Sequence, residues 1–226
     1  MPPRISFVSV ESNHDTTGIR GDRTVIAYAS RTGTRRNLDG LRSAGWRLLV
    51  SARGVLRPEG FRYALDNGAW TAHQEGLPFD SDAFLRAVDL LGVGADWTVI
   101  PDVVGDRDGT LEALRRWLPR LSGLPLLFAV QDGMEPADLP TLGPKMGLFV
   151  GGSTAWKEST MRIWSRVAHD AGAICHVGRV NTVRRIRLCH DAQVDSFDGT
   201  SASKFAISLP KLDRARNHLH LFTEVR

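Results

Sequence analysis

Cysteine is scarce in this sequence, and long apolar runs are missing from it. Its 226 residues include two cysteines, Cys175 and Cys189, too few for a disulfide framework or a C-x-x-C zinc knuckle, so we expect two buried thiols. No apolar run approaches the roughly 18 residues of a membrane span. Residues 1–15 show no apolar stretch followed by a small-residue cleavage site. We therefore expect no membrane partner, no signal peptide and a cytoplasmic location.

Cofactor motifs are also missing. Neither the dinucleotide-binding pattern G-x-G-x-x-G nor the phosphate-loop pattern G-x-x-x-x-G-K-[ST] occurs. The seven histidines form no H-E-x-x-H, and His218 and His220 lie in the basic tail, away from the acidic strand ends. Only His176 is expected near a site. We therefore expect no metal and no organic cofactor.

The charge of the chain suggests a polyanionic partner. Lys and Arg number 29 against 25 Asp and Glu, a formal net charge of +4, and arginines cluster at Arg184, Arg185 and Arg187. A basic, arginine-rich chain suits nucleic acid. The alternative is that the arginines belong to an ordinary solvated surface. The spacing of Glu112 and Arg115 on a predicted helix favours this alternative there.

Short apolar runs alternate with amphipathic stretches along the chain. The runs are rich in Val, Ile, Leu and Phe, as strands buried on both faces are. Nine strands are predicted, at 5–10, 24–29, 47–52, 62–66, 96–102, 126–131, 147–152, 174–178 and 193–198. Five helices are predicted between them, at 34–44, 81–92 capped by Asp80, 109–121 capped by Asp108, 154–171 and 182–189.

This alternation predicts a parallel sheet. Eight or nine strand–helix units in about 200 residues predict an α/β fold of the compact (β/α)8 TIM-barrel type, with a doubly wound open sheet as the alternative. The open sheet usually carries a glycine-rich phosphate loop after its first strand, which this chain lacks. Without a repeat or a linker, residues 1–226 are expected to form a single domain.

Polar residues and glycines recur where the predicted strands end. In a parallel barrel all these ends meet at one mouth, where such enzymes hold their active sites. The pattern therefore predicts a site at this mouth. The strand-end residues are Asp66, Asp102, Gln131, Asp132, Gly151, Gly152, His176, Arg179, Asn181 and Asp198.

The acidic residues allow three interpretations. Helix capping suits Asp106 and Asp108, but it suits Asp66 less, because the Asn–Gly pair after it indicates a turn. Asp198 could instead be a loop residue bonded to the backbone that follows. A metal site is disfavoured by the lack of histidine ligands. Two carboxylates without a metal suit retaining glycosyl transfer, in which one attacks a sugar C1′ and the other moves protons.

Six motifs follow one another between Tyr63 and Lys204: D-N-G-A-W, P-D-V, A-V-Q-D-G, V-G-G-S, H-V-G-R-V-N and D-S-F-D-G. In this order they resemble the landmarks of the tRNA-guanine transglycosylase superfamily, most closely its DNA-acting branch. These are the DpdA-type 7-deazaguanine DNA transglycosylases of bacteriophages and bacterial modification clusters. The resemblance implies a TIM barrel that exchanges guanine in a polynucleotide for a 7-deazaguanine base through a covalent glycosyl-aspartate.

The resemblance also implies roles for single residues. Asp198 matches the nucleophile and Asp66 the general acid/base. The residues expected to contact the base are Trp70 by stacking, Asp102 and Gln131 at its edge, Gly151 and Gly152 through their amides, and Val177 or His176 on the other ring face. The residues expected to hold nucleic-acid phosphates are Arg179, Lys204, Arg184 and Arg185.

Two departures from the tRNA-acting enzymes favour DNA as the partner. The C-x-C-x-x-C zinc motif is missing from the 28 residues after Asp198, and the acid motif is D-N-G-A-W in place of D-S-G-G-Y. The expected partners are thus DNA and a 7-deazaguanine base. The alternatives are a tRNA substrate, a base-releasing N-glycoside hydrolase, or a non-catalytic nucleic-acid-binding barrel.

Overall fold

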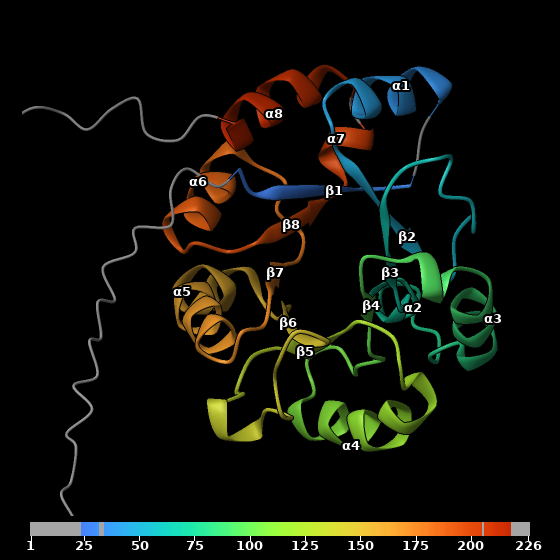
Figure 1. The fold of residues 1–226 in the computed structure, drawn as a ribbon, viewed down its shortest axis with the longest axis vertical. Coiled ribbons are helices and arrows are strands. Elements are labelled where there is room, and N and C mark those ends of the chain that lie inside the picture. Colours follow the sequence, from blue (N-terminus) through green and yellow to red (C-terminus); the bar gives the residue numbers. More distant parts are fainter. Residues whose placement is uncertain (1–23, 32–33, 205, 218–226) are drawn as a thin grey trace, which may run out of the picture.

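A closed barrel of eight parallel strands forms the centre of the computed structural model, which describes residues 24–31, 34–204 and 206–217 (Figure 1). The strands pair in chain order, and β8 closes the ring on β1. They are β1 (Ile26–Ser30), β2 (Arg47–Ser51), β3 (Tyr63–Asp66), β4 (Thr98–Val99), β5 (Leu126–Val130), β6 (Met146–Val150), β7 (Cys175–Val177) and β8 (Ser196–Gly199). The predicted TIM barrel is confirmed, and the alternative of an open sheet is wrong.

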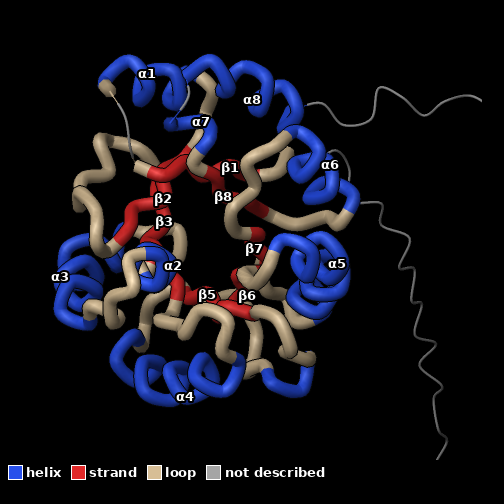
Figure 2. Tube along the Cα trace, turned by 180° about the vertical axis from the view of Figure 1, so that it is seen from behind, coloured by secondary structure: helices blue, strands red, loops and turns tan. Residues whose placement is uncertain are grey.

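Helices surround the strands (Figure 2). They are α1 (Arg35–Ser43), α2 (Ala69–Gln74), α3 (Ser81–Leu91), α4 (Arg107–Trp117), α5 (Thr154–Asp170), α6 (Val183–Asp191), α7 (Ser201–Lys204) and α8 (Leu209–Asn217). Short 3-10 turns occupy Gly92–Gly94, Leu118–Leu121, Pro136–Asp138 and Ala206–Ser208. The predicted helices are present with shifted ends, α2, α7 and α8 are additional, and the predicted strand 5–10 lies outside the described residues.

Two helix starts test the capping predictions. Asp80 caps α3 as predicted, because its Oδ1 accepts a hydrogen bond from the Ala83 amide at 2.9 Å. For α4 the predicted cap, Asp108, is wrong. Asp106 has the extended backbone of a cap and accepts from the Gly109 amide at 2.9 Å. Asp108 lies in the first turn, where a carboxylate also suits the positive end of the helix.

Aromatic side chains fill the inside of the barrel. The interior cluster consists of Tyr28, Leu49, Ala64, Trp97, Val99 and Leu127, with Ile26 and Phe149 packed against it. A second, larger cluster fills the space between the strands and the outer helices. It contains Cys175 and Cys189, which are free and buried as predicted. The barrel therefore has a packed core with no open channel.

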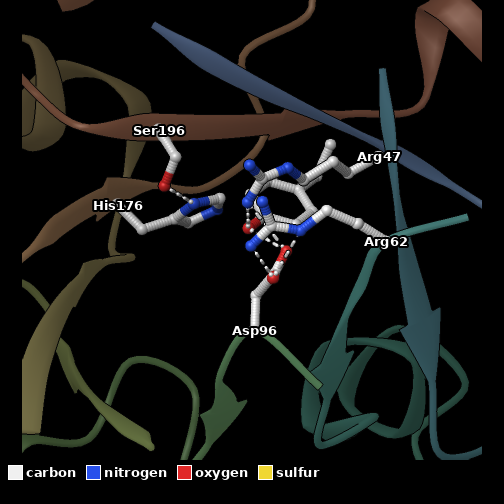
Figure 3. A network of polar contacts seen from close by, with 6 residues as sticks. Arg47, Arg62, Asp96, His176 and Ser196 are labelled. Atoms are coloured by element: carbon white, nitrogen blue, oxygen red, sulfur yellow. Dashed lines mark hydrogen bonds and ion pairs between the residues drawn. The ribbon is translucent and has the colours of Figure 1, made fainter. Parts of the chain in front are cut away.

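A polar network closes the end of the barrel where the strands begin. Asp96, just before β4, accepts hydrogen bonds from the Tyr28 hydroxyl at 2.9 Å, from Arg47 at 2.9 Å and from Arg62 at 2.7 Å. Figure 3 shows Arg47 and Arg62 converging on Asp96, while His176 bonds to Ser196 nearby. The polar side chains at this end of the barrel are thus hydrogen-bonded to one another. This leaves the opposite end, where the strands finish, for a site.

Removing this acid tests the network. We expect Asp96→Ala to lower the free energy of unfolding by about 2 kcal/mol, because three donors lose their shared acceptor. Urea denaturation of the two variants and the parent measures the effect. Asp39→Ala is the matched control: its bridge to Arg42 is about half exposed on both sides, and it is expected to change stability by less than about 0.5 kcal/mol. Equal effects of the two substitutions would contradict the assignment.

Candidate active site

Asp198 is buried at the end of β8, 5% exposed, and its two carboxylate oxygens differ. Oδ1 accepts hydrogen bonds from His176 Nε2–H at 3.1 Å and from the Arg179 amide at 3.3 Å. Within the described part of the chain, no hydrogen bond is made to Oδ2. One oxygen is therefore held in place by two donors, and the other is left as the candidate nucleophilic atom.

His176, which contacts Asp198, packs among aromatic rings. Its ring stacks on Phe149 with centroids 5.0 Å apart and approaches Trp97 at 4.6 Å. Burial lowers the pKa of His176, although Asp198 opposes this shift. The neutral ring donates from Nε2 to Asp198 and accepts at Nδ1 from the Ser196 hydroxyl at 2.8 Å. His176 is thus a support for Asp198.

Burial does not favour the prediction that Val177 or His176 covers a bound base, since both side chains are buried. His176 is fully buried, and its ring already contacts Phe149 and Trp97. Val177 lies on the opposite face of β7, because successive side chains of a strand alternate, and it packs in the outer cluster with Phe197. Neither side chain offers a free surface at the mouth.

Asp66, the last residue of β3, is the second acid of the site. Its Oδ2 accepts a hydrogen bond from the Gly68 amide at 3.1 Å. Burial raises the pKa of Asp66 to about 7, the negative charge of Asp198 adds to this rise, and the Gly68 amide opposes it. The influence of Asp198 places both acids in one electrostatic environment. A carboxyl group that titrates near neutral pH suits general acid/base chemistry.

Asn67, which the Asn–Gly pair places in a turn, orients a third acid. Its side-chain amide donates to Asp102 Oδ1 at 2.8 Å and to the Ile100 carbonyl at 2.9 Å, and its oxygen accepts from the Ala69 amide at 2.8 Å. Burial raises the pKa of Asp102, and the bond from Asn67 opposes this. Asn67 therefore ties the end of β3 to the loop after β4 and fixes Asp102. The turn at Gly68, with φ 83°, also begins α2.

Arg179 reaches across the mouth from the loop after β7. Its guanidinium lies 3.9 Å from the ring centroid of Trp70 and donates a hydrogen bond to the Gly152 carbonyl. Trp70, on α2, is 36% exposed. The aromatic face predicted to stack on a base is thus covered by a cation, in a cation–π contact. A purine stacking on this face would have to displace Arg179.

One of the predicted base contacts, Gln131, is engaged elsewhere. Gln131 is buried, accepts from the Gly105 amide at 2.7 Å, and donates to the Val103 carbonyl at 2.8 Å and to Thr110 at 2.5 Å. It therefore braces the loop between β4 and α4, and its side-chain NH2 group is used there and not at a base edge in this structure.

The two glycines after β6 also differ. The Gly151 amide donates to the Val130 carbonyl at 2.8 Å, so it belongs to the sheet. The Gly152 amide makes no hydrogen bond to the described residues. Gly152 has φ 70°, and a Cβ there would lie 2.5 Å from Asp132 Oδ2, which excludes a side chain. Of the pair, Gly152 is the one whose amide is left for a ligand.

Three of the four predicted phosphate contacts lie on two helices, and the fourth, Arg179, lies in the loop after β7. On α6, Arg184 and Arg185 both pair with Glu158, at 2.7 and 2.9 Å. Lys204 is exposed at the end of α7. These assignments stay predictions. Nearby, Asn181 joins the loops after β7 and β8, because its side-chain oxygen accepts from the amides of Thr200 at 2.8 Å and Ser201 at 3.0 Å.

No protein-family model matches this chain, and no curated protein matches it. In the residues that the structure describes, no group of three His, Cys, Asp or Glu side chains could hold a metal ion. Over the same residues, no helix is long and apolar enough to cross a membrane. What the fold and the mouth define is a (β/α)8 barrel with paired acids at the ends of its strands.

Proposed function

We propose that the protein is a DNA guanine transglycosylase, a glycosyltransferase that exchanges guanine in DNA for a 7-deazaguanine base. The observation that carries the proposal is the unequal pair of acids. Asp198 has one oxygen held by two donors, and its other oxygen accepts no hydrogen bond from the described residues. The charge of Asp198 acts on Asp66, and the pKa of Asp66 is raised to about 7. A fixed nucleophile beside a proton carrier is the arrangement that retaining glycosyl transfer needs.

The first half of the reaction releases guanine. Asp198 Oδ2 attacks C1′ of a nucleotide extruded from the helix, and the C1′–N9 bond breaks with its electron pair leaving on guanine. Protonated Asp66 gives its proton to the departing base. The products are a glycosyl ester on Asp198, free guanine and ionised Asp66, so charge and protons balance.

The second half installs the new base. Asp66, now ionised, takes the N9 proton of the incoming 7-deazaguanine. N9 attacks C1′, the ester bond breaks, and its electron pair returns to the carboxylate of Asp198. No external acid or base is consumed over the cycle. A pKa near 7 suits this double duty, because Asp66 must be protonated in one half and ionised in the other.

Base recognition follows from the groups left at the mouth. Asp102 is positioned by Asn67 and can accept from the N1–H and the amino group that guanine and 7-deazaguanines share. The Gly152 amide can donate to O6. Trp70 can stack on the base once Arg179 has moved aside, a contact worth roughly 1–3 kcal/mol. Arg179 would then be free to meet a phosphate of the same nucleotide.

The test follows two labels. Protein is incubated with duplex DNA and a tritiated 7-deazaguanine base, and in parallel with DNA labelled in its guanines. We expect one base to enter the DNA for each guanine released. Guanine release without incorporation would establish a hydrolase, and incorporation into tRNA alone would establish the tRNA-acting alternative. DNA binding with neither event in either polymer would make the barrel a binding protein and end the proposal.

A further inference from the structure

Lys157 is a buried cation that the proposed chemistry has not used. It lies on α5 and is 4% exposed, whereas the other described lysines, Lys145, Lys204 and Lys211, are exposed. Burial and the charges of Arg179 and Arg185 lower the pKa of Lys157 to about 8, while Asp198 and Cys189 act in the opposite direction. A buried ammonium is unfavourable without a partner, so its contacts are informative.

Lys157 contacts the peptide group that holds the nucleophile. Its Nζ donates a hydrogen bond to the Gly178 carbonyl. The N–H of the same peptide unit belongs to Arg179 and donates to Asp198 Oδ1 at 3.3 Å. Because the peptide unit is planar, with C=O and N–H pointing in opposite directions, fixing the oxygen also fixes the direction of the N–H.

The backbone around this peptide needs such a support. Arg179 has φ 60°, a conformation that is unfavourable for a residue with a side chain. A Cβ on Gly178 would lie 2.7 Å from the Phe149 ring and 3.4 Å from Asp198 Oδ1, so the chain passes close to the carboxylate. The loop is also tied to β8 by the Val180 amide, which donates to the Asp198 carbonyl at 2.6 Å.

We propose that Lys157 is a positioning residue, which holds the Gly178–Arg179 peptide so that its N–H fixes Oδ1 of Asp198 and leaves Oδ2 for attack on C1′. The inference rests on the proposed transglycosylase function for its kinetic consequence. The positioning itself is a property of the free protein. Lys157 touches neither base nor DNA in this scheme, so its loss should slow the chemical step and leave substrate binding intact.

Three variants test the kinetic consequence. Lys157→Met keeps the length of the side chain without the ammonium, Lys157→Arg keeps the charge and a donor, and Lys145→Met removes an exposed lysine as the matched control. In Lys157→Met we expect the single-turnover rate of adduct formation to fall roughly 10- to 100-fold, the effect of one hydrogen bond to a charged group. The KM values for DNA and base should stay within about twofold. Lys157→Arg should recover part of the rate, and Lys145→Met should match the parent.

A second readout does not depend on activity. In Lys157→Met the amide ¹H–¹⁵N resonance of Arg179 should move upfield and its hydrogen exchange should accelerate, with no such change in Lys145→Met. If this shift occurs but the parent protein exchanges no base, the proposed function fails and the positioning role stands. An unchanged Arg179 amide and an unchanged adduct rate in a folded Lys157→Met protein would overturn the inference.

A fourth variant, Asp198→Asn, serves if Lys157→Met does not fold. The sequence has four lysines, so ¹⁵N-lysine labelling gives a simple spectrum in which the ammonium of Lys157 can be titrated. The charge of Asp198 supports the charged form of Lys157. In Asp198→Asn the midpoint of Lys157 should therefore fall below about 8. A midpoint that does not move would show that the two groups are not coupled and would overturn the inference as well.

Discussion

Replacing Asp198 by asparagine is expected to abolish base exchange and the covalent protein–DNA adduct, a loss of at least about 1,000-fold in rate. The carboxamide oxygen can still accept from His176 and from the Arg179 amide. What is lost is the second oxygen, because an amide nitrogen does not attack C1′. The measurement is a denaturing gel of protein mixed with labelled DNA, in which the parent gives a retarded band.

The control for this experiment is Asp80→Asn. Asparagine caps a helix about as well as aspartate, so α3 should be unaffected. This variant is expected to form the adduct at the parental rate. The circular dichroism spectrum of Asp198→Asn should match that of the parent, which separates loss of chemistry from loss of fold. A retarded band of undiminished intensity in Asp198→Asn would assign the nucleophile to another residue.

Asp66→Asn is expected to change both stability and the pH profile of activity. The folded protein keeps the Asp66 proton up to about pH 7, whereas an ordinary aspartate releases it near 3.8. The folded state therefore binds more protons than the unfolded state in this window, and stability falls as pH rises through it. Asparagine removes this dependence. The gain in unfolding free energy of Asp66→Asn over the parent should grow by about 2.5 kcal/mol between pH 5 and pH 8.

The same titration governs activity. Guanine release requires protonated Asp66, so the parent's rate in single-turnover assays should fall about tenfold per pH unit above pH 7. In Asp66→Asn the rate should be about 100- to 10,000-fold lower and this alkaline limb should be missing. Asp80→Asn should keep the limb and show no pH-dependent gain in stability. An unchanged limb in Asp66→Asn would mean that another group carries the proton.

The sequence was enough to predict that two acids, Asp66 and Asp198, lie at the mouth of the barrel. The sequence could not predict which residues of β7 point into the barrel, because a strand places successive residues on opposite faces and the sequence does not say which face lies inside. The pairing of His176 with Ser196 puts both inside with Asp198, and puts Val177 outside with Phe197. Asp106 and Asp108 are equally good caps in sequence, and the backbone conformation of Asp106 decides between them.

The sequence by itself determined the barrel and the placing of Asp66 and Asp198 at strand ends, because apolar runs alternating with amphipathic helices are local patterns that survive in one dimension. Only the tertiary structure decided which polar groups are already engaged, as Gln131 and the Gly151 amide are, and which make no hydrogen bond to the described residues, as is the case for the Gly152 amide. The tertiary structure also places the helical residue Lys157 against the peptide group beside Asp198. The hydrogen-bond partners and the burial of a residue depend on residues distant in the chain, so they are fixed only when the chain folds.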